Sequence, residues 1–108
     1  MDKILVYLGS DHVIQHPSFG VRENILKLTT DREAAISQAC GQDAVGVINA
    51  YSLDLDFLSV KAPEQQVLSG FDGYDVVIPQ EESACYISIC SEAALKSLVF
   101  TNASFVSQ

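Results

Sequence analysis

The sequence predicts a single small α+β domain. Segments with the apolar patterns of strands outnumber those with the patterns of helices, and the two kinds do not alternate regularly, so a doubly wound α/β sheet is not expected. A length of 108 residues suits one compact domain, and 48% hydrophobic residues make the chain too apolar for disorder. Because no repeat, low-complexity tract or linker interrupts the sequence, we expect one domain over residues 1–108.

The N-terminal half carries three strand patterns. Residues 3–8 are apolar and rich in β-branched and aromatic side chains, which is typical of a buried strand, and Gly9-Ser10-Asp11 is expected to end it. Residues 25–29 alternate enough to predict a short strand. Residues 44–55, "AVGVINAYSLDL", predict a long strand that buries one of its faces.

One helix is predicted between the second and third of these strands. Thr30 and Glu33 form a capping-box pattern, in which each side chain bonds to the other's backbone N–H, so Thr30 is expected to be the N-cap. Gly41 is a natural end for this helix. The small apolar residues that would form its buried face are Ala34, Ala35, Ile36, Ala39 and Cys40.

The C-terminal half carries shorter strand patterns. Residues 73–78 and 85–90 predict two strands, and residues 98–106 predict a final strand or hairpin edge. Residues 58–61 either extend the preceding strand or start a short partner.

Two short helices are also predicted in the C-terminal half. Pro63 suits a first helical turn, and Gly70 would end the helix that follows it. Ser91 is a typical N-cap for a second short helix that runs to Ser97. With the helix after Thr30, the domain is expected to hold two or three helices.

The charge balance is strongly acidic. Fourteen Asp and Glu residues against six Lys and Arg residues give a net charge of −8, which excludes direct binding to a nucleic-acid backbone because such binding needs a basic surface. The segment from Asp54 to Glu92 contains eight acidic residues and a single basic residue, Lys61. A solvated acidic surface explains this excess, and steering towards a basic partner protein is the sharper alternative.

The sequence lacks membrane signals. No apolar run approaches the ~20 residues that span a bilayer. The N-terminus has neither a long apolar core nor a small-residue cleavage site, so it predicts a first strand and a cytoplasmic protein.

The three cysteines, Cys40, Cys85 and Cys90, are expected to be reduced and buried. An odd number of cysteines in a chain without a secretory signal argues against a disulfide framework. Cys85 and Cys90 would point to opposite faces of a strand, because their separation is odd, and so could not chelate one metal from it.

The two histidines do not predict a metal site. His12 and His16 have the i, i+4 spacing of a metal pair, but this spacing brings them together only in a helix. Pro17 and the Ser10-Asp11 turn favour a loop at this place. We therefore expect two surface histidines and no metal.

A family resemblance is carried by motifs that follow one another along residues 4–100. "VYLGS", "HPSFG", "LKLTTDREAAISQAC", "GVINAYSLDLDFLSV", "GYDVVI" and "CSEAALKSLVF" resemble a family of small bacterial domains of uncharacterised function. That family is related to the ADP-ribosyltransferase fold, which uses NAD. The resemblance implies a curved, mostly antiparallel β core with an NAD cleft.

The chain departs from the family's pattern at the cleft. Where the family usually has Tyr-His-Gly-Ser, this sequence has Tyr7-Leu8-Gly9-Ser10, and leucine can neither donate to a ribose nor orient one. The family's Gly-Phe-Tyr is absent, and Lys27-Leu28-Thr29-Thr30 stands in its place. A stretch after "YDVVI" is also shortened. These departures predict a degenerate member, a pseudoenzyme.

An enzymatic interpretation still has residues to support it. Gln80-Glu81-Glu82 matches the family's Gln-x-Glu, whose carboxylate would oppose the positive charge of glycosidic cleavage. In that case the resemblance implies that Glu82, Gln80 and Thr29 are catalytic. It also implies that NAD is bound by Tyr7, Gly9 and Ser10. Alternatively, Gln80-Glu81-Glu82 is a solvated acidic turn without a catalytic role.

Two hypotheses follow. The favoured one is a non-catalytic, acidic protein-binding module without a cofactor, such as an antitoxin, an anti-defence inhibitor or a regulatory subunit. Its partner would carry a basic surface and would contact Asp72, Asp75, Glu81 and Glu82. The alternative is a divergent mono-ADP-ribosyltransferase or NAD glycohydrolase that uses Glu82.

Overall fold

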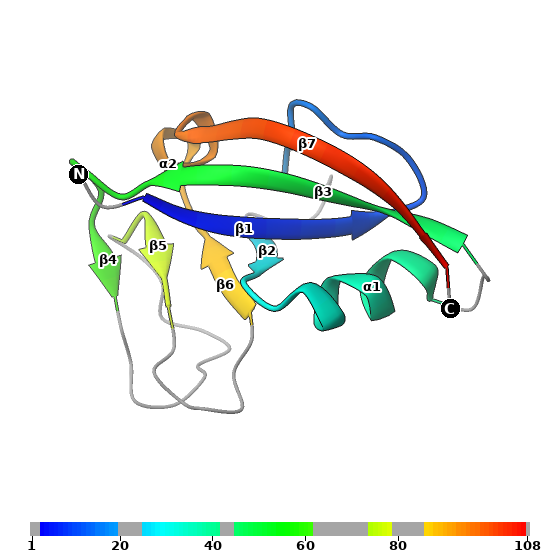
Figure 1. Ribbon diagram of the computed structural model, residues 1–108. Coiled ribbons are helices and arrows are strands. Elements are labelled where there is room, and N and C mark those ends of the chain that lie inside the picture. Colours follow the sequence, from blue (N-terminus) through cyan, green and yellow to red (C-terminus); the bar gives the residue numbers. More distant parts are fainter. Residues whose placement is uncertain (1–2, 20–24, 42–44, 62–73, 79–85, 108) are drawn as a thin grey trace.

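The computed structural model describes residues 3–19, 25–41, 45–61, 74–78 and 86–107. Within these ranges it contains seven strands and two helices (Figure 1). In chain order the elements are β1 (Lys3–Ser10), β2 (Leu26–Thr29), α1 (Arg32–Cys40), β3 (Val45–Asp54), β4 (Val60–Lys61), β5 (Val76–Val77), β6 (Tyr86–Ile89), α2 (Glu92–Lys96) and β7 (Leu98–Ser107).

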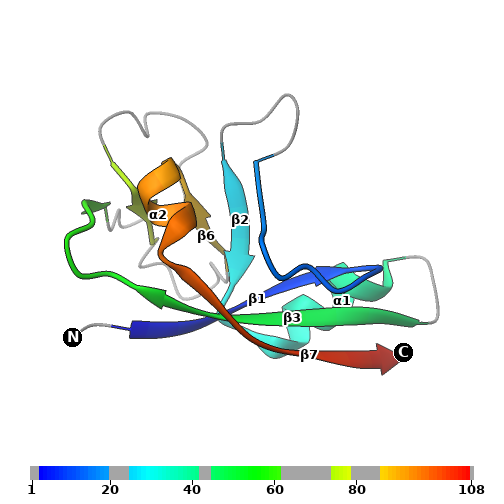
Figure 2. The ribbon, with the colours of Figure 1, turned by 90° about the horizontal axis from the view of Figure 1, so that it is seen from above.

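The strands form one sheet in the order β4-β5-β6-β2-β1-β3-β7. Neighbouring strands are antiparallel except β4 and β5, which are parallel. The long strands β1, β3 and β7 lie alongside one another, while β2 leaves β1 at a steep angle, so the sheet is strongly bent (Figure 2). The bend falls where β1 and β2 share the residue pair Tyr7 and Thr29. The predicted α+β class and the curved, mostly antiparallel core are confirmed.

The two faces of the sheet are covered differently. The apolar core lies on one face, together with α2, and its buried members are Val6, Leu28, Tyr51, Leu53, Val76, Ile87, Ile89 and Ala94. Helix α1 lies on the other face, against β1 and β3 (Figure 1). Alternation along β3 explains this division, because successive side chains of a strand point to opposite faces.

Helix α1 begins at a different cap from the one predicted. Asp31 is the N-cap, and its carboxylate accepts a hydrogen bond of 3.1 Å from the backbone N–H of Glu33. Thr30 is exposed and precedes the cap, so its assignment as N-cap was wrong. The physical reason is that aspartate is at least as good an N-cap as threonine, and Thr29 Oγ1 also accepts from the Asp31 N–H at 3.0 Å. The end at Gly41 is confirmed, with a φ of 51°.

Two glycines let α1 approach the sheet closely. A Cβ on Gly9 would lie 2.4 Å from the carbonyl oxygen of Ala35, and one on Gly46 would lie 2.5 Å from the carbonyl carbon of Ala39. The Gly9 N–H also donates to the side-chain oxygen of Gln38 at 3.0 Å. Strand β1 runs two residues beyond the predicted range of 3–8 and ends at Ser10, within the Gly9-Ser10-Asp11 segment that was expected to end it.

The strands predicted over 73–78 and 85–90 are the shorter β5 and β6. The strands predicted over 25–29, 44–55 and 98–106 are β2, β3 and β7. Residues 58–61 contribute β4, a short partner of β5 and not an extension of β3. Ser91 is the N-cap of α2, as predicted, and accepts from the Ala94 N–H at 3.1 Å. The helix predicted between Pro63 and Gly70 lies outside the described residues.

Candidate functional site

A loop of residues 11–19, the first loop, follows β1 and is held by a buried amide. The side-chain oxygen of Asn49, which is fully buried in β3, accepts a hydrogen bond of 2.8 Å from the Ile14 N–H. Its side-chain nitrogen donates to the carbonyl oxygens of Leu8 at 3.2 Å and His12 at 3.3 Å. Every polar atom of this amide is therefore bonded, as a buried polar group requires.

A second buried side chain of β3 holds the same loop. The hydroxyl of Tyr51 donates to the carbonyl oxygen of Ile14 at 2.5 Å. Burial raises the pKa of Tyr51 to about 12, which keeps this hydroxyl protonated and able to donate. Ile14 is thus bonded through both its N–H and its carbonyl. The Asn49 and Tyr51 side chains together fix the first loop on the apolar face of the sheet.

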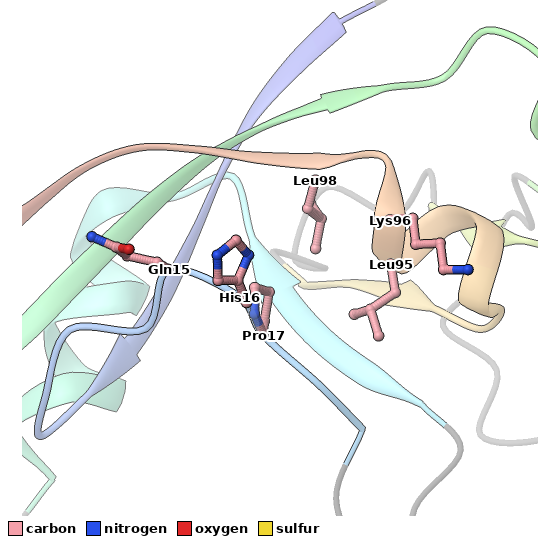
Figure 3. Close-up of a pocket in the computed structure, with 6 residues that line it drawn as sticks. All are labelled: Gln15, His16, Pro17, Leu95, Lys96 and Leu98. Carbon is pink, nitrogen blue, oxygen red and sulfur yellow. The ribbon is translucent and has the colours of Figure 1, made fainter.

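A pocket of about 270 Å³ lies between the first loop and the junction of α2 and β7 (Figure 3). Its lining residues are Gln15, His16, Pro17, Leu95, Lys96 and Leu98. Leu95 and Leu98 also pack against the core cluster, whereas His16 and Lys96 are exposed at the rim. Among the described residues that line the pocket, two leucines form an apolar floor and Lys96 is the charged side chain at the rim.

Sequence reasoning missed this pocket. His16 was considered only as a metal ligand, and Lys96 only as part of a short helix. Eighty positions separate these two residues (96 − 16), so no local pattern connects them. The nearest signal in the sequence is Asn49, a polar residue on the strand face that it shares with Val47, Tyr51 and Leu53. A polar side chain on a buried face needs hydrogen-bond partners, and here these are in the first loop.

The structure brings together two of the residues predicted for an NAD site. Tyr7 and Thr29 are register partners on β1 and β2. Tyr7 is half-buried, and Thr29 is fully buried with its hydroxyl bonded to Asp31. Whether these side chains bind a cofactor stays a prediction, because Glu82 and Gln80 lie outside the described residues.

The other two residues predicted for NAD, Gly9 and Ser10, lie beneath α1 and at the start of the first loop. Gly9 is buried under α1, as described above. The Ser10 hydroxyl donates to the carbonyl of His12 and accepts from the side-chain nitrogen of Asn49 at 3.2 Å. Both residues therefore have structural contacts, and their assignment to a cofactor stays a prediction.

Asp75 is the described member of the acidic set predicted to contact a partner. Its carboxylate accepts from the Ser59 N–H at 2.8 Å and from the Ser91 hydroxyl at 2.5 Å. These hydrogen bonds, that from Ser59 first, lower the pKa of Asp75. Asp75 therefore connects the segment before β4 to the N-cap of α2. Asp72, Glu81 and Glu82 lie outside the described residues.

The histidines lie on the surface, as predicted. His12 and His16 are exposed in a loop and not in a helix. His12 Nδ1 lies 2.5 Å from the Asp11 carboxylate, and this contact lowers the pKa of Asp11. Among the described residues, no group of three His, Cys, Asp or Glu side chains could hold a metal ion.

The described cysteines are free thiols, as predicted. Cys40 is buried and Cys90 is half-buried. Desolvation, with a contribution from the negative charge of Asp75, raises the pKa of Cys90, so this thiol is protonated and a poor nucleophile at neutral pH. Cys85 lies outside the described residues.

In comparisons with known proteins, the chain matches no family model, no curated protein and no solved structure. The relation to ADP-ribosyltransferase-like domains stays a prediction that rests on the motifs quoted above. Over the part of the chain that the structure describes, no helix is long and apolar enough to cross a membrane.

Proposed function

We propose that this chain is a non-catalytic protein-binding module on an ADP-ribosyltransferase-like scaffold. One observation carries the proposal: three of the polar groups that the resemblance would assign to an NAD site, those of Thr29, Ser10 and Gly9, are engaged in holding the fold. The Thr29 hydroxyl bonds to Asp31 at the start of α1, and the Ser10 hydroxyl bonds to Asn49 and His12. The Gly9 N–H bonds to Gln38 of α1. A cofactor that used these groups would have to displace each of these contacts.

Leu8 supports the same proposal. It stands where the family usually has a histidine, and it packs half-buried against the core cluster. Its carbonyl oxygen is bonded to the Asn49 side chain. Leu8 thus contributes apolar packing and a backbone acceptor that helps to hold the first loop, and its side chain has no hydrogen bond to offer a ribose.

The charge of the chain supports a protein as the ligand. A net charge of −8 attracts a basic partner at long range and accelerates association. The Asp75 carboxylate already accepts hydrogen bonds from Ser59 and Ser91. In this proposal, therefore, the acidic side chains that bind the partner are those of Asp72, Glu81 and Glu82. The pocket beside the first loop, whose floor is apolar, adds a concave surface for an apolar side chain of the partner.

A second candidate function is favoured by the pairing of Tyr7 with Thr29. This pairing brings an aromatic hydroxyl and a threonine to adjacent strands, as an NAD-cleaving site that uses Glu82 would need. The alternative is a divergent mono-ADP-ribosyltransferase or NAD glycohydrolase, with Gln80 and Thr29 assisting.

One experiment separates the two functions. The purified chain is incubated with NAD, and release of nicotinamide is followed by chromatography beside the matched Glu82→Gln variant. We expect the two proteins to release no more nicotinamide than buffer alone. Release by the parent chain that Glu82→Gln abolishes would overturn the non-catalytic proposal and establish the alternative.

A further inference from the structure

Strand β7 forms one edge of the sheet. It pairs with β3 from Leu98 to Ser107, and it is the last strand in the sheet order. Among the described residues no strand pairs with its outer side, and β7 lies at the border of the sheet in Figure 2. An edge strand presents a row of unpaired N–H and C=O groups that can pair with another chain.

The β7 edge lacks two of the usual protections against such pairing. Its sequence, "LVFTNASFVS", contains no charged residue and no proline, the two devices that natural proteins most often place on an edge. Val99 is 61% exposed and Phe105 is 82% exposed. The pairing of β7 with β3 shifts register near Thr101. The Thr101 hydroxyl donates to the Ala50 carbonyl at 3.1 Å, so this side chain bonds to β3. A regular, uncharged segment from Asn102 to Ser107 remains at the edge.

The opposite edge of the sheet is different. Strand β4 has two residues, Val60 and Lys61, so it is short and includes a lysine. It follows the usual pattern of a protected edge. Self-pairing is therefore favoured at β7 and not at β4, and an assembly through β7 alone closes as a dimer and does not grow into a filament.

We propose that β7 pairs antiparallel with β7 of a second copy of this chain. Antiparallel pairing about a two-fold axis is self-complementary, because each free N–H meets a C=O of the other copy. Each copy carries a net charge of −8, so most surfaces of two copies repel one another. The uncharged β7 edge lets them meet without opposed like charges, and the exposed Phe105 of each copy adds apolar contact.

This pairing is independent of the proposed function. A basic partner finds no carboxylate on β7, so the dimer would use a surface that such a partner does not need. An enzymatic chain would form the same dimer. Failure of one proposal therefore leaves the other unchanged.

Sedimentation of the purified full chain over a micromolar to millimolar range tests the dimer. We expect a monomer–dimer equilibrium that shifts towards the dimer as salt is added, because salt screens the repulsion between two acidic copies. A chain that stays monomeric at every concentration and salt level would overturn the proposal. Association that weakens with salt would do so too, because it would indicate attraction between opposite charges.

A matched pair of variants locates the interface. Phe105→Lys places a charge on the β7 edge, and Val13→Lys makes the same charge change in the first loop, where Val13 is 43% exposed. We expect Phe105→Lys to weaken dimerisation by roughly tenfold or more and Val13→Lys to leave it near the parent value. Equal effects of the two variants would overturn the assignment to β7.

Hydrogen exchange on the unmodified chain gives a second measurement if Phe105→Lys fails to fold. The proposal predicts that, within residues 102–107, the amides that point away from β3 gain protection as protein concentration rises, while those of α1 do not. Protection of these outward amides that is independent of concentration would overturn the proposal.

Discussion

The backbone N–H of Ile14 donates a hydrogen bond of 2.8 Å to the side-chain oxygen of Asn49, a residue 35 positions later in the chain. Asn49 has no exposed surface. The bond therefore links a surface loop to the interior of the sheet. It explains why a polar residue stands in the middle of the apolar strand β3, and it gives the wall of the pocket a fixed position.

Replacement of Asn49 tests the role of this bond. We expect Asn49→Ala to lower the free energy of unfolding by about 1–3 kcal/mol, because it leaves the Ile14 N–H and the Leu8 carbonyl without their buried partner. Urea denaturation measures the change. The matched control is Ser18→Ala at an exposed position of the first loop, which should shift the midpoint little. Similar midpoints for the two variants would mean that the amide does not hold the loop.

The cap of α1 gives a second test. Asp31→Ala should cost on the order of 1 kcal/mol, because the carboxylate that accepts from the Glu33 N–H is lost. Thr30→Ala should leave the denaturation midpoint close to that of the parent, since Thr30 precedes the cap. The opposite order of the two variants would restore Thr30 as the N-cap.

The Asp75 carboxylate predicts a pH dependence of stability. Hydrogen bonds from Ser59 and Ser91 lower its pKa in the folded state, so the fold favours the ionised form. Its contribution to stability is therefore complete at neutral pH and is lost as the pH falls through the lowered pKa of the folded state.

Thermal melts of the parent and Asp75→Asn between neutral and acidic pH measure this contribution. The difference in melting temperature should be largest at neutral pH and should shrink on acidification. Glu92→Gln, in the first turn of α2, removes one negative charge nearby as a control. A difference between parent and Asp75→Asn that grows towards acidic pH would contradict the assignment.

Local patterns in the sequence predicted much of the fold. The alternation in residues 44–55 and the serine before Glu92 were sufficient for β3 and α2, because strand periodicity and caps depend on neighbouring residues. Thr30 was mistaken for the cap because Asp31, beside it, offers the same chemistry one position later. In the structure the Thr29 hydroxyl accepts from the Asp31 N–H, which favours Asp31 over Thr30 as the cap. The capping-box pattern does not include this contact.

The site depends on contacts between distant residues, and the sequence could not predict these. Gly9 was interpreted only as part of the turn that ends a strand, and the sequence did not predict that it lies against Ala35 of α1. The pocket is lined by both His16 and Lys96, and the first loop that carries His16 is held against the apolar face by Asn49 and Tyr51. That two residues so far apart in the sequence line one pocket follows from tertiary packing, which no local sequence pattern predicts.

The central claim is that the chain binds protein and not NAD, and thermal melting with NAD tests it most directly. A ligand at a hundred times its dissociation constant adds about 2.7 kcal/mol to the stability of the fold, which shifts the melting temperature of a domain of this size by several degrees. We predict that millimolar NAD leaves the melting temperature of the parent chain unchanged. A clear rise with NAD, which Glu82→Gln or Thr29→Val removes, would contradict the account.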